Sequence, residues 1–176
     1  WQFDSVNPGG GKYVPVTEYA VRDAQDKLGR WVVRIGEAHD NFTKARELTE
    51  EMVDEMYDFS GGQVLFSVVE ATNATRFRYT RRGAISFFVG NDCNFPADRG
   101  FAVDQPWSEV RWKIQGMEVL EKYRAHVFGT SWFCCDRDGK ELELEFVMGY
   151  LSDDDGQLRL FFHDMGHPYQ TPYSSR

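Results

Sequence analysis

The C-terminal half of the chain carries the pattern that most restricts its fold, a series of segments with the two-residue period of β-strands. The segments 108–116 and 140–151 both alternate apolar with polar or small residues. In "KELELEFVMGYL" (140–151) the apolar members are Leu142, Leu144, Phe146 and Met148. Such alternation indicates strands with one buried face. Further strands are expected at 123–136 and 157–165, and the turn sequences "DRDG" and "SDDDG" join the last three, which predicts an antiparallel sheet.

Helical patterns occupy the N-terminal half. After Thr17, which is expected to cap the first helix, apolar residues recur at steps of three and four, as on one buried helical stripe. A second helix is expected within 48–59, with Thr49 as its cap, and a short third helix at 80–90. Between them, the β-branched run 63–71 predicts a strand.

Helices followed by antiparallel strands are typical of the α+β class, with the sheet wrapped on the helices. A curved sheet around a long N-terminal helix makes a cone with a pocket at its open end. We expect this cone domain to span residues 17–169, between an N-terminal lead-in at 1–16 and a C-terminal tail at 170–176. The first residue is not Met, so we expect a domain of a longer, processed precursor.

Composition excludes several classes of function. Lys and Arg total 20 against 28 Asp and Glu, a formal charge of −8, and no basic stripe suggests a nucleic-acid partner. No apolar run approaches the ~20 residues that span a bilayer, so we expect a soluble protein. The three cysteines, of which Cys134 and Cys135 are adjacent, have neither a disulfide-framework nor a zinc-site spacing.

Several phrases, in order, resemble the iota class of carbonic anhydrases, which has the nuclear-transport-factor-like cone fold and is related to the association domain of calmodulin-dependent kinase II. The resemblance runs over residues 17–169. It rests on "VLFSVV" (64–69), "SFF" (86–88), "GFAVDQPWSEVRW" (100–112), "DGKELELEFVMGY" (138–150), "DDDGQLRL" (153–160) and "HDMGHPY" (163–169).

The resemblance implies interconversion of carbon dioxide and bicarbonate in a Phe-lined pocket, with no metal and no cofactor. It implies His163 as the catalytic residue. The family's pocket Thr, Tyr and Ser fall on Val69, Phe87 and Met165 of this chain, which have no hydroxyl. Each lost transition-state hydrogen bond typically costs about 10²–10³ in rate, which makes the activity doubtful. The complete set of expected pocket residues is Phe66, Val69, Phe87, Phe88, Met165, His126 and Tyr169.

Alternative roles remain open for these residues. A His163 with a pKa near neutrality would serve as a general base toward water, helped by His126 from a neighbouring strand. Strand alternation places His163 and Met165 on one face and Asp164 on the other. Metal binding by His163 and His167 is disfavoured, because a spacing of four suits a helix rather than a strand.

The alternative interpretation is a cone domain without catalytic activity. In that case the chain is a homodimer or a structural, docking subunit of a larger algal organellar assembly. Its interface would use the aromatic segment 123–133 and Trp112, which the sequence suggests is exposed. Family usage suggests a plastid rather than a mitochondrion.

Overall fold

A mixed sheet packed on three helices makes up the part of the chain that the structure describes. The computed structural model describes residues 15–71, 76–153 and 156–170, so most of the expected lead-in and tail lies outside it. Along the chain the elements are α1 (Glu18–Glu37), α2 (Phe42–Met56), β1 (Leu65–Ser67), β2 (Phe77–Arg78), α3 (Arg81–Val89), β3 (Glu109–Leu120), β4 (Arg124–Cys135), β5 (Lys140–Ser152) and β6 (Leu158–Gly166).

Of the two helix caps that the sequence predicted, Thr17 is confirmed and Thr49 is not. The side chain of Thr17 accepts a hydrogen bond from the backbone N–H of Ala20 at the start of α1, and Thr80 caps α3 in the same way. The expectation for Thr49 was wrong. Helix α2 begins earlier, capped by Asn41, and Thr49 lies buried inside it, where its hydroxyl donates to the carbonyl oxygen of Ala45.

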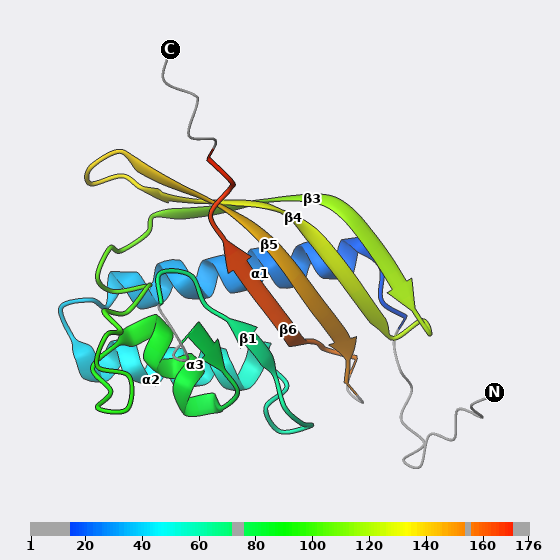
Figure 1. Ribbon diagram of the computed structural model, residues 1–176, viewed down its shortest axis with the longest axis horizontal. Helices are drawn as coiled ribbons and strands as arrows, with labels where there is room; N and C mark the ends of the chain where they lie inside the picture. The colour runs from blue at the N-terminus through cyan, green and yellow to red at the C-terminus, as the bar shows by residue number, and fades with distance from the viewer. Residues whose placement is uncertain (1–14, 72–75, 154–155, 171–176) are drawn as a thin grey trace.

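The sheet confirms the predicted α+β cone and adds a parallel pair. Its strand order is β2-β1-β6-β5-β4-β3, antiparallel throughout except that β1 runs parallel to β6. The long strands β3, β4 and β5 bend around α1 (Figure 1), and register irregularities at Ile114/Gly116 and Gly149/Tyr150 coincide with that curvature. The two-residue strand β2 has no sequence pattern long enough to be recognised.

Side-chain alternation divides the sheet into an inner face, against the helices, and an outer face. His163 and Met165 of β6 are buried on the inner face, whereas Asp164 points outward, 3.8 Å from Arg76. Trp112 was expected to be exposed, but it is partly buried on the inner face, with its ring against those of Phe133 and Phe146. In β3, residues that point inward alternate with charged residues that point outward. Because Trp112 is at an inward position, its indole lies toward α1.

The described helices include none that is both long and apolar enough to cross a membrane.

Close packing at Gly129 generates a stability prediction. A Cβ added to this β4 residue would overlap the backbone carbonyl oxygen of Lys113 on β3, whereas one added to Gly166 on β6 would meet open space. We expect Gly129→Ala to lower the free energy of unfolding by about 1–3 kcal/mol, because the strand backbone must move. Gly166→Ala should stay within about 0.5 kcal/mol of the original chain. Urea unfolding measures both, and equal effects would contradict the close β3–β4 approach.

Candidate functional site

The imidazole of His163 lies at the centre of the inner face. Residue 163 pairs with Phe66 of β1 on one side and with Met148 of β5 on the other, so its backbone is held by two strands. Its ring stacks on that of Phe66, with centroids 4.9 Å apart and planes 9° apart. Only 1% of the residue is exposed. His163 is therefore a fixed part of the aromatic core.

Tyr57 is the polar partner of His163. It follows the last turn of α2, where its backbone forms a bridge with Leu160 of β6 and the N–H of Asp58 donates to the Leu160 carbonyl oxygen, 3.0 Å away. This pairing sets the phenol beside the imidazole, with the Tyr57 hydroxyl oxygen 2.8 Å from Nδ1 of His163. The sequence analysis missed Tyr57, because a contact across 106 positions leaves no local pattern.

A small space, here called the inner cavity, adjoins the other side of the imidazole. Its volume is about 10 Å³, close to the minimum that holds one water molecule. Among the described residues, neither Nε2 of His163 nor Nε1 of Trp112 has a hydrogen-bond partner. The lining side chains are predominantly apolar: Leu28, Val32, Phe88, Phe101, Trp112, Phe133, His163 and Met165.

Burial sets the protonation state of this pair. Removal from water lowers the pKa of His163 from its ordinary 6.5 to about 3, because the charged form is penalised. Burial also raises the pKa of Tyr57 well above its usual value. Both groups are therefore neutral near pH 7. A near-neutral pKa, which would suit a general base, is not what this environment produces.

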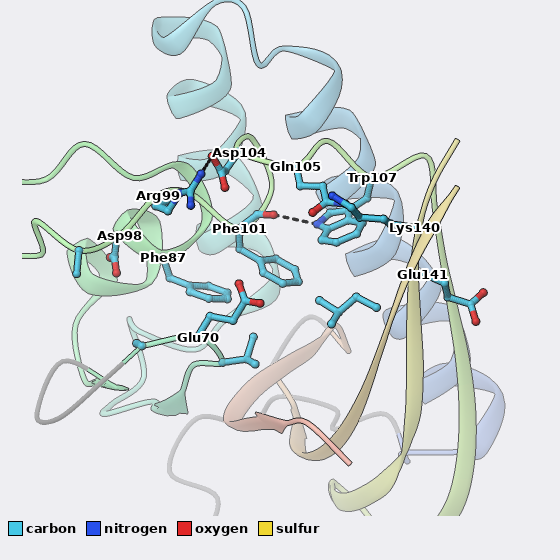
Figure 2. Close-up of a pocket in the computed structure, with 15 residues that line it drawn as sticks. Glu70, Phe87, Asp98, Arg99, Phe101, Asp104, Gln105, Trp107, Lys140 and Glu141 are labelled. Carbon is cyan, nitrogen blue, oxygen red and sulfur yellow. Dashed lines mark hydrogen bonds and ion pairs between the residues drawn. The ribbon is translucent and has the colours of Figure 1, made fainter. Parts of the chain in front are cut away.

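A larger space, here called the outer cleft, opens on the far side of Phe101. Its volume is about 530 Å³. Figure 2 shows the rings of Phe87 and Phe101 side by side among the residues that line it. The Trp107 indole N–H donates to the Phe101 carbonyl oxygen, 2.9 Å away. The charged side chains at this cleft have both signs: Glu70, Asp98, Arg99, Asp104, Lys140 and Glu141.

Four of the expected pocket residues line these two spaces, and a fifth, Phe66, does not. Phe88 and Met165 line the inner cavity, and Val69 and Phe87 line the outer cleft. Phe66 lines neither, because it lies behind the imidazole of His163. Phe101 lines both spaces, and its ring contacts those of Phe87 and Phe133 at centroid distances of 5.1 and 5.0 Å. Aromatic side chains therefore stand between the inner cavity and the outer cleft.

The structure places the other two expected pocket residues elsewhere. His126 is exposed on the outer face of β4, with its ring 6.0 Å from that of Phe161, and strand β5 separates it from β6. It therefore does not approach His163. Tyr169 follows the end of β6 and is 83% exposed. Its hydroxyl does not reach the inner cavity.

The described part of the chain holds no cluster of three His, Cys, Asp or Glu side chains that could bind a metal ion. The two C-terminal histidines also differ in environment, because His163 is buried whereas His167 is exposed.

Comparisons with known proteins agree with this architecture. A family model described as metal-independent carbonic anhydrase matches residues 19–166. A metal-independent carbonic anhydrase of Nostoc sp. is 34% identical over 157 residues, covering 88% of this chain and 75% of that protein. A crystal structure of a cyanobacterial iota-carbonic anhydrase complexed with bicarbonate superposes with a TM-score of 0.86 at 31% identity, covering 91% of this chain and 97% of that chain.

The buried imidazole generates a prediction about acid stability. Because the folded-state pKa of about 3 lies below the unfolded value of about 6.5, the unfolded chain binds a proton first. Neutral His163 therefore contributes fully above pH 6.5, and its contribution falls by up to about 1.4 kcal/mol per pH unit as the pH drops toward 3.

We expect His163→Gln to reduce the slope of unfolding free energy against pH between about 6.5 and 4. The matched control His126→Gln removes an exposed histidine and should keep the original slope. Denaturant unfolding at a series of pH values measures the free energy of unfolding of all three chains. Because these chains share the same carboxylates, a difference in slope comes from the substituted histidine. Identical slopes for the His163→Gln and original chains would show that residue 163 is not buried in the neutral form.

Proposed function

The chain belongs to the metal-independent carbonic anhydrase family, and we propose that its inner cavity interconverts carbon dioxide and bicarbonate slowly, with His163 holding the reacting oxygen. The observation that carries this proposal is the unpartnered Nε2 of a fully buried histidine at the edge of a small cavity. A buried polar atom without a partner is rare in folded proteins and points to a bound water or ligand.

The apolar walls suit the substrate. Carbon dioxide has no net dipole and favours a cavity lined by rings and aliphatic side chains, while one or two fixed polar groups orient its oxygens. In hydration, the water oxygen bonds to carbon, one C–O π bond breaks toward its oxygen, and a water proton is released to the buffer, which leaves bicarbonate. A hydrogen bond to the oxygen that gains charge lowers this barrier. We propose that Nε2 of His163 supplies it.

Two features make the reaction slow. Met165 lines the inner cavity at a position where the family pattern has a Ser hydroxyl, and a missing transition-state hydrogen bond costs about 10²–10³ in rate. The inner cavity, at about 10 Å³, also has room for about one water, so entry of a three-atom substrate requires side chains such as Phe101 to move.

Stopped-flow hydration of carbon dioxide tests this function. We expect weak activity that a chelator does not change and that falls at least about 10-fold in His163→Ala, because the retained polar group is lost. His126→Ala, on the outer face, should leave the rate unchanged. Equal rates for both variants would contradict a role for His163.

Restoring a hydroxyl at the inner cavity tests the reason for the slow rate. The variant Met165→Ser should increase turnover by about 10² if the new hydroxyl reaches the reacting atoms, whereas Val69→Thr, at the outer cleft, should leave it unchanged. The same hydration assay measures both, and circular dichroism checks that the core remains folded. A folded Met165→Ser variant with unchanged turnover would contradict this explanation.

Pairing through the outer sheet face is a second candidate role. Four large apolar side chains on this face are exposed, as two pairs on neighbouring strands with β6 between the pairs: Leu65 and Phe77 on β1 and β2, and Phe128 and Val147 on β4 and β5. Phe128, for example, is 54% exposed and pairs directly with residue 147. An apolar face of this kind on a soluble domain is typical of a surface that binds a partner. We propose a second copy of the chain as that partner.

The pairing predicts that Phe128→Glu dissociates a dimer, because a carboxylate would be buried in an apolar interface. Tyr19→Glu is the control, since Tyr19 is an exposed aromatic residue on α1, away from the outer sheet face. Sedimentation velocity over a range of concentrations measures the mass. A monomeric original chain at every concentration would contradict the pairing.

A further inference from the structure

We propose that Tyr57 is a positioning residue that donates its phenol proton to Nδ1 of His163 and thereby keeps the imidazole proton on Nε2. His163 then presents a hydrogen-bond donor, rather than a lone pair, to the inner cavity. This inference deepens the proposed function, because it specifies how His163 acts on a bound oxygen. It also defines which small molecules the inner cavity accepts.

The geometry holds the two side chains together. The Tyr57 hydroxyl oxygen lies 2.8 Å from Nδ1, and both residues are 1% exposed. Their rings are nearly parallel, with centroids 5.9 Å apart and planes 26° apart, and the ring of Phe66 contacts both. Because the backbones of α2 and β6 are bridged beside them, neither side chain has room to exchange its partner for water.

Counting protons gives the direction of the hydrogen bond. Burial keeps both groups neutral, so the phenol has one proton and the imidazole has one. Nδ1 of His163 is the one hydrogen-bond partner that the described part of the chain gives the phenol. If Nδ1–H donated to the phenol oxygen, the phenol O–H and the lone pair of Nε2 would both be buried without a partner, each at a cost of about 1–3 kcal/mol. Donation by Tyr57 leaves one such group, the N–H on Nε2, and an oxygen in the inner cavity can accept from it.

The inner cavity then has one hydrogen-bond donor beside it, the N–H on Nε2 of His163. Trp112 also lines the cavity, but its indole Nε1 lies toward Gly29 of α1. The remaining lining residues are apolar, apart from the weakly accepting thioether of Met165. A space with one donor and no strong acceptor favours oxygen acceptors, such as carbon dioxide, bicarbonate or the oxygen of water. In this tautomer His163 stabilises negative charge on a bound oxygen and does not remove a proton from water.

Nitrogen-15 NMR of the full chain with labelled histidine reads the tautomer directly. We expect a single His163 signal set with the proton on Nε2 and a bare Nδ1, identified by its disappearance in His163→Gln. In Tyr57→Phe the Nδ1 signal should move toward that of a tautomer mixture, because the donor is gone. The result does not depend on that variant folding, since the original chain alone reports which nitrogen is protonated.

Tyr150→Phe is the matched control. Tyr150 is also a fully buried tyrosine, but its hydroxyl donates to the sulfur of Met148, 3.2 Å away. Removing that hydroxyl should leave the His163 signals unchanged. A proton on Nδ1 in the original chain would overturn the inference, as would His163 signals that do not respond to Tyr57→Phe.

A kinetic readout separates this inference from the proposed function. Tyr57→Phe should reduce the rate of carbon dioxide hydration by about 10-fold with little change in KM, because the donor acts on charge that develops in the transition state. An inactive original chain with the proton on Nε2 would remove the proposed function and keep the tautomer assignment. An active chain with the proton on Nδ1 would keep the proposed function and remove the tautomer assignment.

Discussion

The stacking of the His163 imidazole in an aromatic core is the interaction on which this site depends. The parallel pairing of β1 with β6 sets Phe66 on one face of the imidazole, and the bridge between the end of α2 and β6 sets Tyr57 at its edge. Burial lowers the histidine pKa to about 3, so the ring is a neutral polar group. Its remaining nitrogen adjoins the inner cavity without a partner in the described structure. The fold therefore positions an unpaired hydrogen-bonding atom beside a small, mainly apolar cavity.

Apolar side chains stand at the three positions where the family resemblance places hydroxyls, Val69, Phe87 and Met165. Val69 and Phe87 line the outer cleft and Met165 lines the inner cavity. Phe101 lies between these two spaces and packs on Phe87, which closes the interior with rings. The chain keeps the family fold, and we expect slow turnover because few polar groups at the inner cavity can stabilise a transition state.

The sequence predicted the features that depend on local periodicity or capping. Alternation along 157–165 placed His163 and Met165 inward, and Thr17 marked the start of α1. The sequence did not predict the hydrogen bond between Tyr57 and His163, because this bond joins the end of α2 to a strand far along the chain. His126 was misplaced for a related reason, since its distance from His163 depends on the strand order and on β5 lying between.

A high-resolution crystal structure of the chain soaked in bicarbonate is the sharpest test of this site. We expect a bound oxygen, from bicarbonate or from a single water, within about 2.7–3.2 Å of Nε2 of His163, a normal hydrogen-bond distance. An inner cavity without density, with bicarbonate found only in the outer cleft, would show that the buried imidazole is a structural part of the core and holds no substrate.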